Sequence, residues 1–239
     1  MHLIFASRFD HTLGVPNLGS ESIDDYLKAI LELSGPAGEA ATSNAIAQRL
    51  GVSAPSVTGM LQKLSTGNRP CVTYRKHHGA RLTNGGRKRA LRIIRRHRLV
   101  ELFLCQILGY SWDEVHEEAE RLEHFISEKL EERIAHKLGN PEFDPHGDII
   151  PGKDGTLPER KTMALGDVPP GKSVVVCSVA DRDPEILRYL KRIGLTPNRL
   201  LVVSDHGPFE GPITVRLHDE ADIRALSPRL AAAILVRVA

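Results

Sequence analysis

The spacing of apolar residues along the chain predicts helices in its first part and strands in its last. Apolar residues recur at the helical period in SIDDYLKAILEL, so we expect an amphipathic helix that begins near Ser22. The stretch TSNAIAQRLGVSAPSVTGMLQKL predicts two short helices joined by a tight turn, and CVTYRKHHGARLT predicts a β-hairpin that bends near Gly79. From residue 84 to about residue 138 the pattern stays helical throughout.

A stretch rich in Pro and Gly, GNPEFDPHGDIIPGKDGTLPER, then predicts a linker or an ordered loop. Beyond about Leu165, short β-type runs surround one helix near DPEILRYLKRIG. These runs are residues 173–179, 200–204, 213–217 and 234–238. Such a pattern predicts a small β-barrel with one helical insert.

The two short helices have the turn chemistry of a helix-turn-helix. Ala47 is small where the helices would cross, Gly51 can adopt the positive φ that ends the first helix, and Val57 points inward from the second. Ser53 is a suitable N-cap for the second helix, and Pro55 falls in its first turn, where a missing N–H costs little. The pattern favours DNA binding over its alternative, an ordinary helical hairpin.

In a helix-turn-helix the exposed start of the second helix enters the major groove of DNA, and a basic hairpin after it suits phosphate contacts. The DNA-contact candidates are Ser53, Pro55, Ser56, Thr58, Gly59 and Lys63 on the helix, and Arg75 and Lys76, with His77, His78 and Arg81, on the hairpin. The motif does not indicate which DNA sequence would be preferred.

Charges are unevenly distributed, although the net charge of the 239 residues is only +2. Residues 87–98 carry seven basic side chains and no acid, whereas residues 113–132 carry nine acids against two basic residues. This contrast suggests two different partners. The basic run is equally consistent with phosphate contacts and with the solvated side of a helix.

Composition favours a soluble protein of the cytoplasm. A hydrophobic content of 41% and a charged content of 26% fit a globular chain, and no apolar run is long enough to span a membrane. Cys71, Cys105 and Cys177 are too widely spaced for a disulfide framework or a zinc motif, which favours a reducing compartment. We expect Cys105 and Cys177 in the core, and residues 1–19 as a flexible tail.

The acidic stretch EVHEEAERLEHFISEKLEERI, taken as one helix, places His116, Glu120, Glu123 and His124 in a stripe about 100° wide. The adjoining stripe is apolar and contains Val115, Ala119, Leu122, Ile126 and Leu130. Carboxylates at the edge of a core are costly unless they are compensated, which a divalent cation can do. A metal site and a salt-bridged surface are equally consistent with this helix alone.

Other segments supply partners for such a site. His97 and Glu101 lie one turn apart in the preceding helix, and Asp24 and Asp25 lie in the first helix. If these helices pack together, carboxylate and imidazole ligands converge without a thiolate, which favours Mn²⁺ or Fe²⁺ over a Cys-rich zinc site. A metallohydrolase could use the same ligands, but the sequence offers no separate nucleophile or phosphate-binding loop.

From Ser22 to Ala239 the chain resembles the diphtheria toxin repressor family of metal-dependent transcription repressors, and within it the manganese transport regulators. The stretches that carry the resemblance are DDYLKAILEL, IAQRLGVSAPSVTGMLQKL, RRHRLVELFL, GYSWDEVHEEAERLEHFISEKLEERI, NPEFDPHGDIIPG and DRDPEILRYLKRIGL. The resemblance implies a mainly α fold with small β parts. Its expected domains are an N-terminal winged helix-turn-helix (20–90), a helical metal-binding and dimerisation domain (91–150), a linker (151–166) and a C-terminal SH3-like β-barrel like that of a ferrous-iron transport accessory protein (167–239).

The resemblance also implies two metal sites in each protomer. The primary site maps onto Asp25, Glu120, Glu123 and His124; the ancillary site maps onto His97, Glu101 and His116, with Asp181, Asp183 and Glu185 as candidates from the SH3-like domain. Asp25 and Glu120 stand where the iron-responsive branch has Met and Cys, and this difference favours Mn²⁺. Lys28 stands where some two-domain manganese regulators have a glutamate ligand, which favours two separated sites.

The function that the resemblance implies is repression of transcription rather than catalysis. We expect a homodimer that Mn(II) activates to bind a palindromic operator in double-stranded DNA and that controls manganese uptake, with no membrane partner. Fe(II), Co(II) or another divalent ion is the alternative activator, which leaves an iron(II)-dependent repressor of the same fold as a second hypothesis. An accessory protein of ferrous-iron transport would explain only the C-terminal domain.

Overall fold

The computed structural model describes residues 18–35, 38–180 and 182–239. The chain divides into two compact units, one that ends at Gly86 and one that begins at Arg87, and each is described by itself. Most of the expected tail lies outside the described residues, but its last two residues, Leu18 and Gly19, already belong to the first helix.

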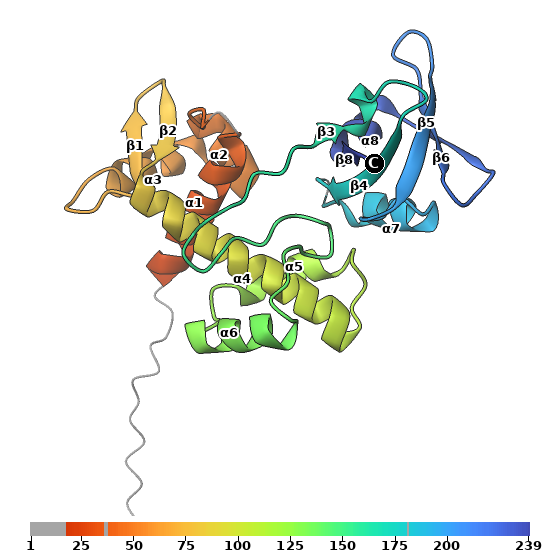
Figure 1. Ribbon diagram of the computed structural model, residues 1–239. Helices are drawn as coiled ribbons and strands as arrows, with labels where there is room; N and C mark the ends of the chain where they lie inside the picture. Colours follow the sequence, from red (N-terminus) through yellow and green to blue (C-terminus); the bar gives the residue numbers. More distant parts are fainter. Residues whose placement is uncertain (1–17, 36–37, 181) are drawn as a thin grey trace, which may run out of the picture. The chain divides into compact units, whose positions relative to one another are not determined.

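The first unit has the helices and the hairpin that the sequence predicts (Figure 1). Its elements are α1 (Leu18–Leu33), α2 (Ser43–Leu50), α3 (Ala54–Leu64), β1 (Val72–Arg75) and β2 (Gly79–Leu82). The three helices bury one apolar face each against a shared core that includes Leu27, Ile30, Ile46, Val57 and Leu61.

The turn between α2 and α3 is specified by local chemistry. Gly51 ends α2 with φ 65°, which favours glycine, and the Ser53 hydroxyl accepts a hydrogen bond from the Ser56 N–H at the start of α3. Thr42 caps α2 in the same way through the Ala45 N–H. The predicted helix-turn-helix is therefore confirmed.

The hairpin is fixed to the helices at one close backbone contact. Ala41 and Ala80 exchange both backbone hydrogen bonds, each 2.9 Å long. Gly79 has φ 84°, and a Cβ atom there would lie 2.5 Å from the Ala41 carbonyl oxygen. Only glycine fits both constraints.

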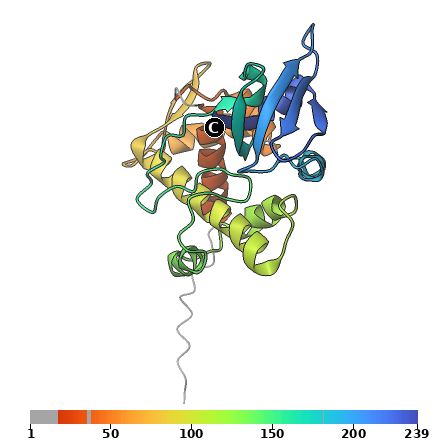
Figure 2. The same ribbon diagram turned by 45° about the vertical axis from the view of Figure 1, so that its right-hand side comes forward.

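The second unit begins with helices that pack around α4 (Asn84–Leu108). Val115 and Ala119 of α5 (Val115–Leu122) contact Val100 and Leu104, while Ile134 and Ala135 of α6 (Glu128–Lys137) contact Leu99 and Leu102. Both short helices lie beside α4 in the two views (Figure 1, Figure 2).

The prediction of one helix over residues 114–134 is wrong, because the chain turns between α5 and α6. The Ser127 hydroxyl accepts a hydrogen bond from the Leu130 N–H and caps a new helix there. The turn also changes what is buried. Leu122 and Leu130, both expected on the apolar stripe, are exposed in the single chain.

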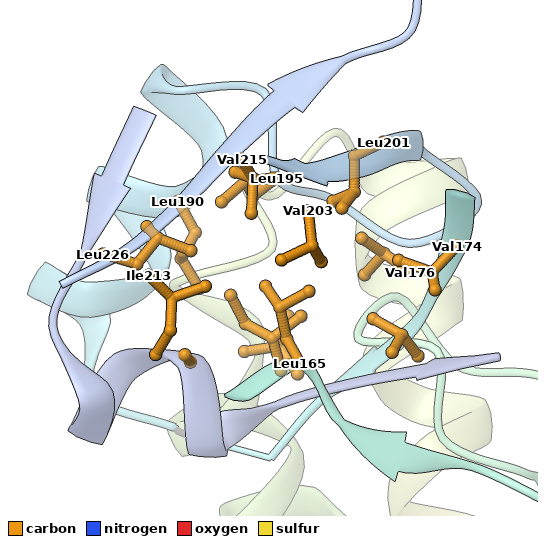
Figure 3. Close-up of a cluster of buried hydrophobic side chains, with 14 of the residues drawn as sticks. Leu165, Val174, Val176, Leu190, Leu195, Leu201, Val203, Ile213, Val215 and Leu226 are labelled. Atoms are coloured by element: carbon orange, nitrogen blue, oxygen red, sulfur yellow. The ribbon is translucent and has the colours of Figure 1, made fainter. Parts of the chain in front are cut away.

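The C-terminal part forms an antiparallel barrel-like sheet with strand order β3-β8-β4-β5-β6-β7. Its elements are β3 (Met163–Ala164), the 3₁₀ turn η1 (Leu165–Asp167), β4 (Ser173–Val179), α7 (Pro184–Arg192), β5 (Leu200–His206), β6 (Ile213–Leu217), β7 (Ile223–Leu226), α8 (Pro228–Ala233) and β8 (Ile234–Val238). The four predicted β runs and the one predicted helix are confirmed; β3, β7 and α8 were not predicted. Inward-facing Val and Leu side chains fill the core (Figure 3).

The segment between α6 and β3 is an ordered loop, one of the two predicted alternatives. Residues 139–162, all of them described, contain no helix or strand beyond an isolated bridge between Phe143 and Ile149. The Asp144 carboxylate accepts hydrogen bonds from the His146 and Asp148 N–H groups and closes the turn. Gly147 lies so close to β4 that a Cβ atom would come within 2.0 Å of the Cys177 carbonyl oxygen.

None of the helices in the described ranges is both long enough and apolar enough to cross a bilayer.

Replacing Gly79 by Ala should loosen the hairpin locally. The added Cβ collides with the Ala41 carbonyl and the residue must adopt a positive φ, so we expect a loss of about 2 kcal/mol in local opening free energy. Hydrogen exchange of the Ala80 N–H should then be about 30-fold faster. Gly59→Ala in α3, where an added Cβ meets nothing within 4 Å, is the matched control; equal protection in both variants would contradict this account.

Candidate metal centre

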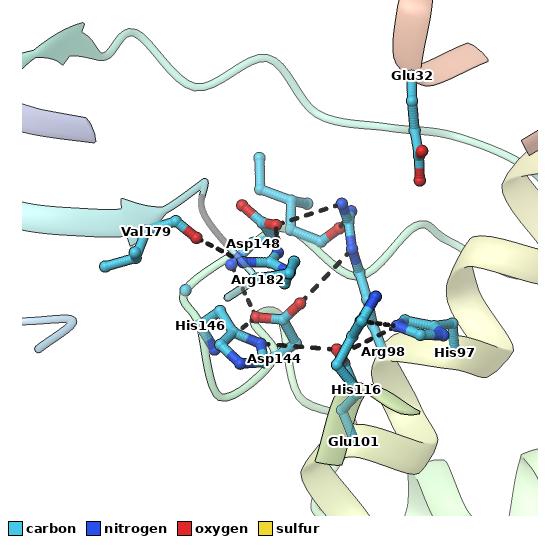
Figure 4. A network of polar contacts seen from close by, with 12 residues as sticks. Glu32, His97, Arg98, Glu101, His116, Asp144, His146, Asp148, Val179 and Arg182 are labelled. Atoms are coloured by element: carbon cyan, nitrogen blue, oxygen red, sulfur yellow. Dashed lines mark hydrogen bonds and ion pairs between the residues drawn. The ribbon is translucent and has the colours of Figure 1, made fainter. Parts of the chain in front are cut away.

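Buried carboxylates and imidazoles gather around Glu101, in the middle of α4 (Figure 4). Its side chain is only 1% exposed, and its two carboxylate oxygens face different groups of side chains. Oε1 faces the imidazoles of His97 and His116, whereas Oε2 faces His146.

The first group, on the Oε1 side, joins the residues predicted for the ancillary site. Glu101 Oε1 lies 2.9 Å from His97 Nε2 and 3.2 Å from His116 Nδ1, and the two ring nitrogens lie 3.1 Å apart. His116 Nε2 is also 3.7 Å from Glu120 Oε1. His97, His116 and Glu120 place their ligand atoms close enough for one metal ion. The predicted convergence of His97, Glu101 and His116 is confirmed.

His97 also contacts a residue predicted for the primary site. Its Nδ1 atom lies 2.5 Å from Oε2 of Glu123, which is fully buried, while Glu123 Oε1 lies 3.6 Å from His124 Nε2. The two ring nitrogens of His97 therefore face ligands of two different predicted sites.

The second group, on the Oε2 side, contains Glu101, Asp144 and His146, all buried. Their ligand atoms lie within 4.8 Å of one another. Sequence reasoning missed Asp144 and His146, because they fall in a Pro- and Gly-rich stretch that was expected to be a linker or an ordered loop and that has no helical or strand period. The one signal for them was the DPH spacing, which places an imidazole two residues after a carboxylate.

A hydrogen bond identifies which ring nitrogen of His146 is a donor. Its Nε2 lies 2.7 Å from the Trp112 carbonyl oxygen, which can only accept a hydrogen bond, so Nε2 carries the proton and donates it. Nδ1, the other ring nitrogen, faces Glu101 Oε2, 3.8 Å away, and can present a lone pair to a cation when it carries no proton. An imidazole held in this way is prepared to bind a cation.

The second group also passes a test of fit to a metal ion. Glu101 Oε2, Asp144 Oδ2 and His146 Nδ1 are buried, and none of the three has a hydrogen-bond partner among the described residues. Buried polar atoms are nearly always satisfied, so three such atoms turned toward one another need an explanation. A divalent cation that accepts O and N ligands would satisfy all three.

Burial and neighbouring charges shift the pKa values of Glu101 and Asp144 in opposite directions. Burial would raise the pKa of Glu101, but the charge of His97 and the neighbouring imidazoles of His116, His146 and His97 hold it well below its usual range. Burial, with the charges of Glu101 and Asp148, raises the pKa of Asp144 to about 6, although Arg98 and His146 lower it. Negative charge at Asp144 is thus costly in the absence of a cation.

The expected ligands from the SH3-like domain do not join either group. The Asp183 side chain accepts a hydrogen bond from the Glu185 N–H, caps α7 and is exposed, and Glu185 is exposed as well. Neither belongs to a candidate ligand group of the described residues, so their role in the ancillary site stays a prediction. Asp181 lies outside the described residues. The residue that reaches this region is Arg182, which donates hydrogen bonds to the Asp148 carboxylate and the Val179 carbonyl.

The cysteines and half of the basic run have structural roles. Cys177 is buried, and burial raises the pKa of Cys105, packed against two apolar clusters, to about 11. In α4, Arg95 and Arg96 both donate to the buried Glu131 carboxylate, and Arg98 lies between Asp144 and Asp148. Arg87, Lys88 and Arg92, nearer the start of the helix, are exposed.

Family models match three successive parts of this chain. Family models match residues 19–80 (iron dependent repressor, N-terminal DNA binding domain), 83–152 (iron dependent repressor, metal binding and dimerisation domain) and 163–238 (FeoA domain). The iron-dependent repressor IdeR of Mycobacterium leprae is 32% identical over 195 residues, which cover 77% of this chain and 84% of that protein.

Solved structures of a manganese-dependent repressor and of a manganese regulator also resemble this chain. A manganese-dependent transcriptional repressor in complex with manganese is 38% identical, covers 91% of this chain and 100% of its own, and has a TM-score of 0.84. The manganese regulator SloR is 32% identical, with coverages of 94% and 100% and a TM-score of 0.73. The chain is a metal-dependent transcriptional repressor of the diphtheria toxin repressor family.

The DNA-binding domain of this repressor presents the predicted contact residues to solvent. Ser53, Pro55, Ser56, Gly59 and Lys63 of α3 are exposed, and Thr58 is half-buried. Arg75 and Lys76 on the hairpin are exposed too. A groove between the starts of α2 and α3 and the hairpin is lined by residues that include Ser43, Pro55, Thr58, Lys76 and His77. In the same domain α1 carries Asp25, half-buried, and Lys28, buried.

Asp144→Asn should stabilise the metal-free repressor at pH 7.5 by about 1–2 kcal/mol. The folded-state pKa of Asp144 lies above its unfolded value, so its ionised carboxylate costs stability at neutral pH, and the cost shrinks as the pH falls from about 6 toward the unfolded pKa of about 4. The gain in thermal midpoint should therefore shrink at pH 5. Asp219→Asn, at an exposed ion pair with Arg199, should show no such gain. A variant less stable than the parent at pH 7.5 would exclude this explanation.

Proposed function

We propose that the repressor is activated by Mn(II), binds a palindromic operator as a homodimer and represses genes for manganese uptake. The observation that carries the proposal is the set of buried carboxylate and imidazole ligands around Glu101, three of whose atoms have no hydrogen-bond partner among the described residues. No thiolate takes part in the candidate groups of the described residues, and oxygen-rich ligand sets suit Mn²⁺ better than softer ions.

The ligands are assigned as follows. Family resemblance gives Asp25, Glu120, Glu123 and His124 to the primary site, and His97, Glu101 and His116 to the ancillary site. The contacts of Glu101 Oε2 add Asp144 and His146 as ligands that serve the same repressor. When bound, a divalent ion would neutralise carboxylates that are otherwise costly to keep charged in the interior.

His97 would connect the two sites through its two ring nitrogens. If Nε2 serves the ancillary site, Nδ1 carries the proton and donates to Glu123, 2.5 Å away. Glu123 is thereby held in one orientation. The arrangement supports a mechanism in which a filled ancillary site preorganises a ligand of the primary site.

Activation would follow from the division of the primary ligands between domains. Asp25 belongs to the DNA-binding domain, and Glu120, Glu123 and His124 belong to the dimerisation domain. A ligand shifts a conformational equilibrium only through its differential affinity for the two states, so the DNA-competent state must have the higher Mn²⁺ affinity. A coupling of about 1–3 kcal/mol for each protomer is typical.

The helical domain offers apolar surface for a second copy of the chain. Exposed apolar side chains occur on the end of α4 and on the segment from α5 to α6, and they include Phe125, which is 60% exposed, and Leu130, which is 46% exposed. Such residues are typical of protein–protein interfaces. In a homodimer, two α3 helices would face two half-sites of the operator.

An iron(II)-activated repressor is the second candidate, because IdeR, an iron-dependent repressor, is 32% identical to this chain. The carboxylates at Asp25 and Glu120 favour manganese. Operator binding titrated with Mn²⁺ and, without oxygen, with Fe²⁺ at the same ionic strength distinguishes the two.

Asp25→Ala should raise the Mn²⁺ concentration needed for operator binding by about 5- to 150-fold, because one ligand that favours the DNA-competent state is lost. Fluorescence anisotropy of an operator selected from random DNA measures the shift. Asp24→Ala, one residue away, is the control. If the Asp25→Ala variant without metal binds the operator as well as the parent does with it, the coupling model fails.

Phe125→Glu should convert the dimer into a monomer at micromolar concentration, because a charge would be buried in the interface. Sedimentation velocity measures the change. Phe209→Glu, which alters a fully exposed aromatic residue at the β5–β6 tip, is the control and should leave the dimer intact. If both variants still form dimers, the dimer interface lies elsewhere on the protein.

A further inference from the structure

The second metal-ligand group adjoins a pair of arginines that come from different domains (Figure 4). Arg98 of α4 lies with Nε 3.6 Å from Asp144 Oδ2 and Nη2 3.6 Å from Asp148 Oδ2. Arg182, just before α7 in the FeoA domain, donates to the same Asp148 oxygen. The carboxylates at this end of the group are thus already partly neutralised by the protein.

Arg182 stands in the region where a carboxylate ligand from the FeoA domain was expected. Its side chain is one-quarter exposed, and its Nη1 also donates to the Val179 carbonyl at the end of β4. Burial lowers the pKa of Arg182, but the charges of Asp148, Asp144 and Glu101 outweigh it and raise the pKa overall. Arg182 thus places a positive charge beside Asp148, whose N–H donates a hydrogen bond to Asp144, one of the three residues of the group.

A guanidinium cannot act as a ligand, and it stays charged at every physiological pH. It therefore affects a metal ion in this group through its charge and through the position of Asp148. Removing one positive charge from a partly buried cluster makes the local potential more negative, and a divalent ion gains twice as much from this as a proton does.

We infer that Arg182 is an affinity-determining residue that lowers the divalent-ion affinity of the Glu101–Asp144–His146 group by electrostatic opposition. With Arg182 present, the group binds a divalent ion only at a higher free-metal concentration than the same ligands would need without it. The FeoA domain then contributes to sensing through this fixed cation. This inference rests on the proposed function, because it assumes that the group binds a divalent ion.

The test uses the full chain with Asp25→Ala and His116→Ala, which remove one ligand from each of the other two sites and leave this group intact. Mn²⁺ binding is measured from the electron paramagnetic resonance signal of free Mn²⁺ at fixed pH and ionic strength. In this background Arg182→Gln should tighten Mn²⁺ binding about tenfold. Arg182→Lys, which keeps the charge, should change it by less than about threefold, and Asp144→Asn should abolish it.

Arg188→Gln is the matched control. Arg188 makes another ion pair between the FeoA domain and the helical domain, with Asp113 at 3.0 Å, and it does not touch the ligand group. Removal of this pair should leave Mn²⁺ affinity unchanged.

Four results would overturn the inference. Weaker or unchanged binding in Arg182→Gln excludes electrostatic opposition, and equal effects of Arg182→Gln and Arg182→Lys show a purely geometric role. If Arg182→Gln and Arg188→Gln change Mn²⁺ affinity equally, the attachment of the FeoA domain to the helical domain is responsible rather than the charge beside the group. Absence of Mn²⁺ binding in the background chain, with its fold confirmed by circular dichroism, would contradict the assignment of Asp144 and His146 as ligands and overturn the inference with it.

Discussion

The architecture of the second unit depends on the burial of Glu101. A carboxylate with 1% of its side chain exposed needs compensation, and the chain brings imidazoles to it from three segments: His97 of α4, His116 of α5 and the loop that carries His146. Protein hydrogen bonds satisfy Oε1 but leave Oε2 without a partner among the described residues. This asymmetry marks the side on which a cation is needed.

The loop at residues 139–150 carries Asp144 and His146 and is held in place by contacts with β4. Gly147 packs directly against the Cys177 carbonyl of β4, and the His146 carbonyl accepts a hydrogen bond from the Val179 N–H. The same turn holds Asp144 and His146 against Glu101. Packing of this loop against β4 therefore positions Asp144 and His146, so the FeoA domain shapes the candidate metal centre through its backbone.

Features governed by local chemistry were predictable from the sequence. Caps and a left-handed glycine specify the helix-turn-helix, and the one-turn spacing of His97 and Glu101 places both side chains on one face of α4. The break at Ser127 was missed because the apolar period continues with the same phase on both sides of the turn. Asp144, His146 and Arg182 were missed for a different reason. Residues in loops have no period, and only tertiary packing decides which of them face a site.

The position of Trp112 has a spectroscopic consequence. It is the only tryptophan of the chain, it is buried, and its ring stacks on the His146 ring at a centroid distance of 5.8 Å. Its carbonyl accepts the Nε2 proton of the same histidine. All intrinsic tryptophan fluorescence of this protein therefore originates beside one candidate ligand group. Emission from the unlabelled repressor reports on the surroundings of Trp112, of which the stacked His146 ring is a part.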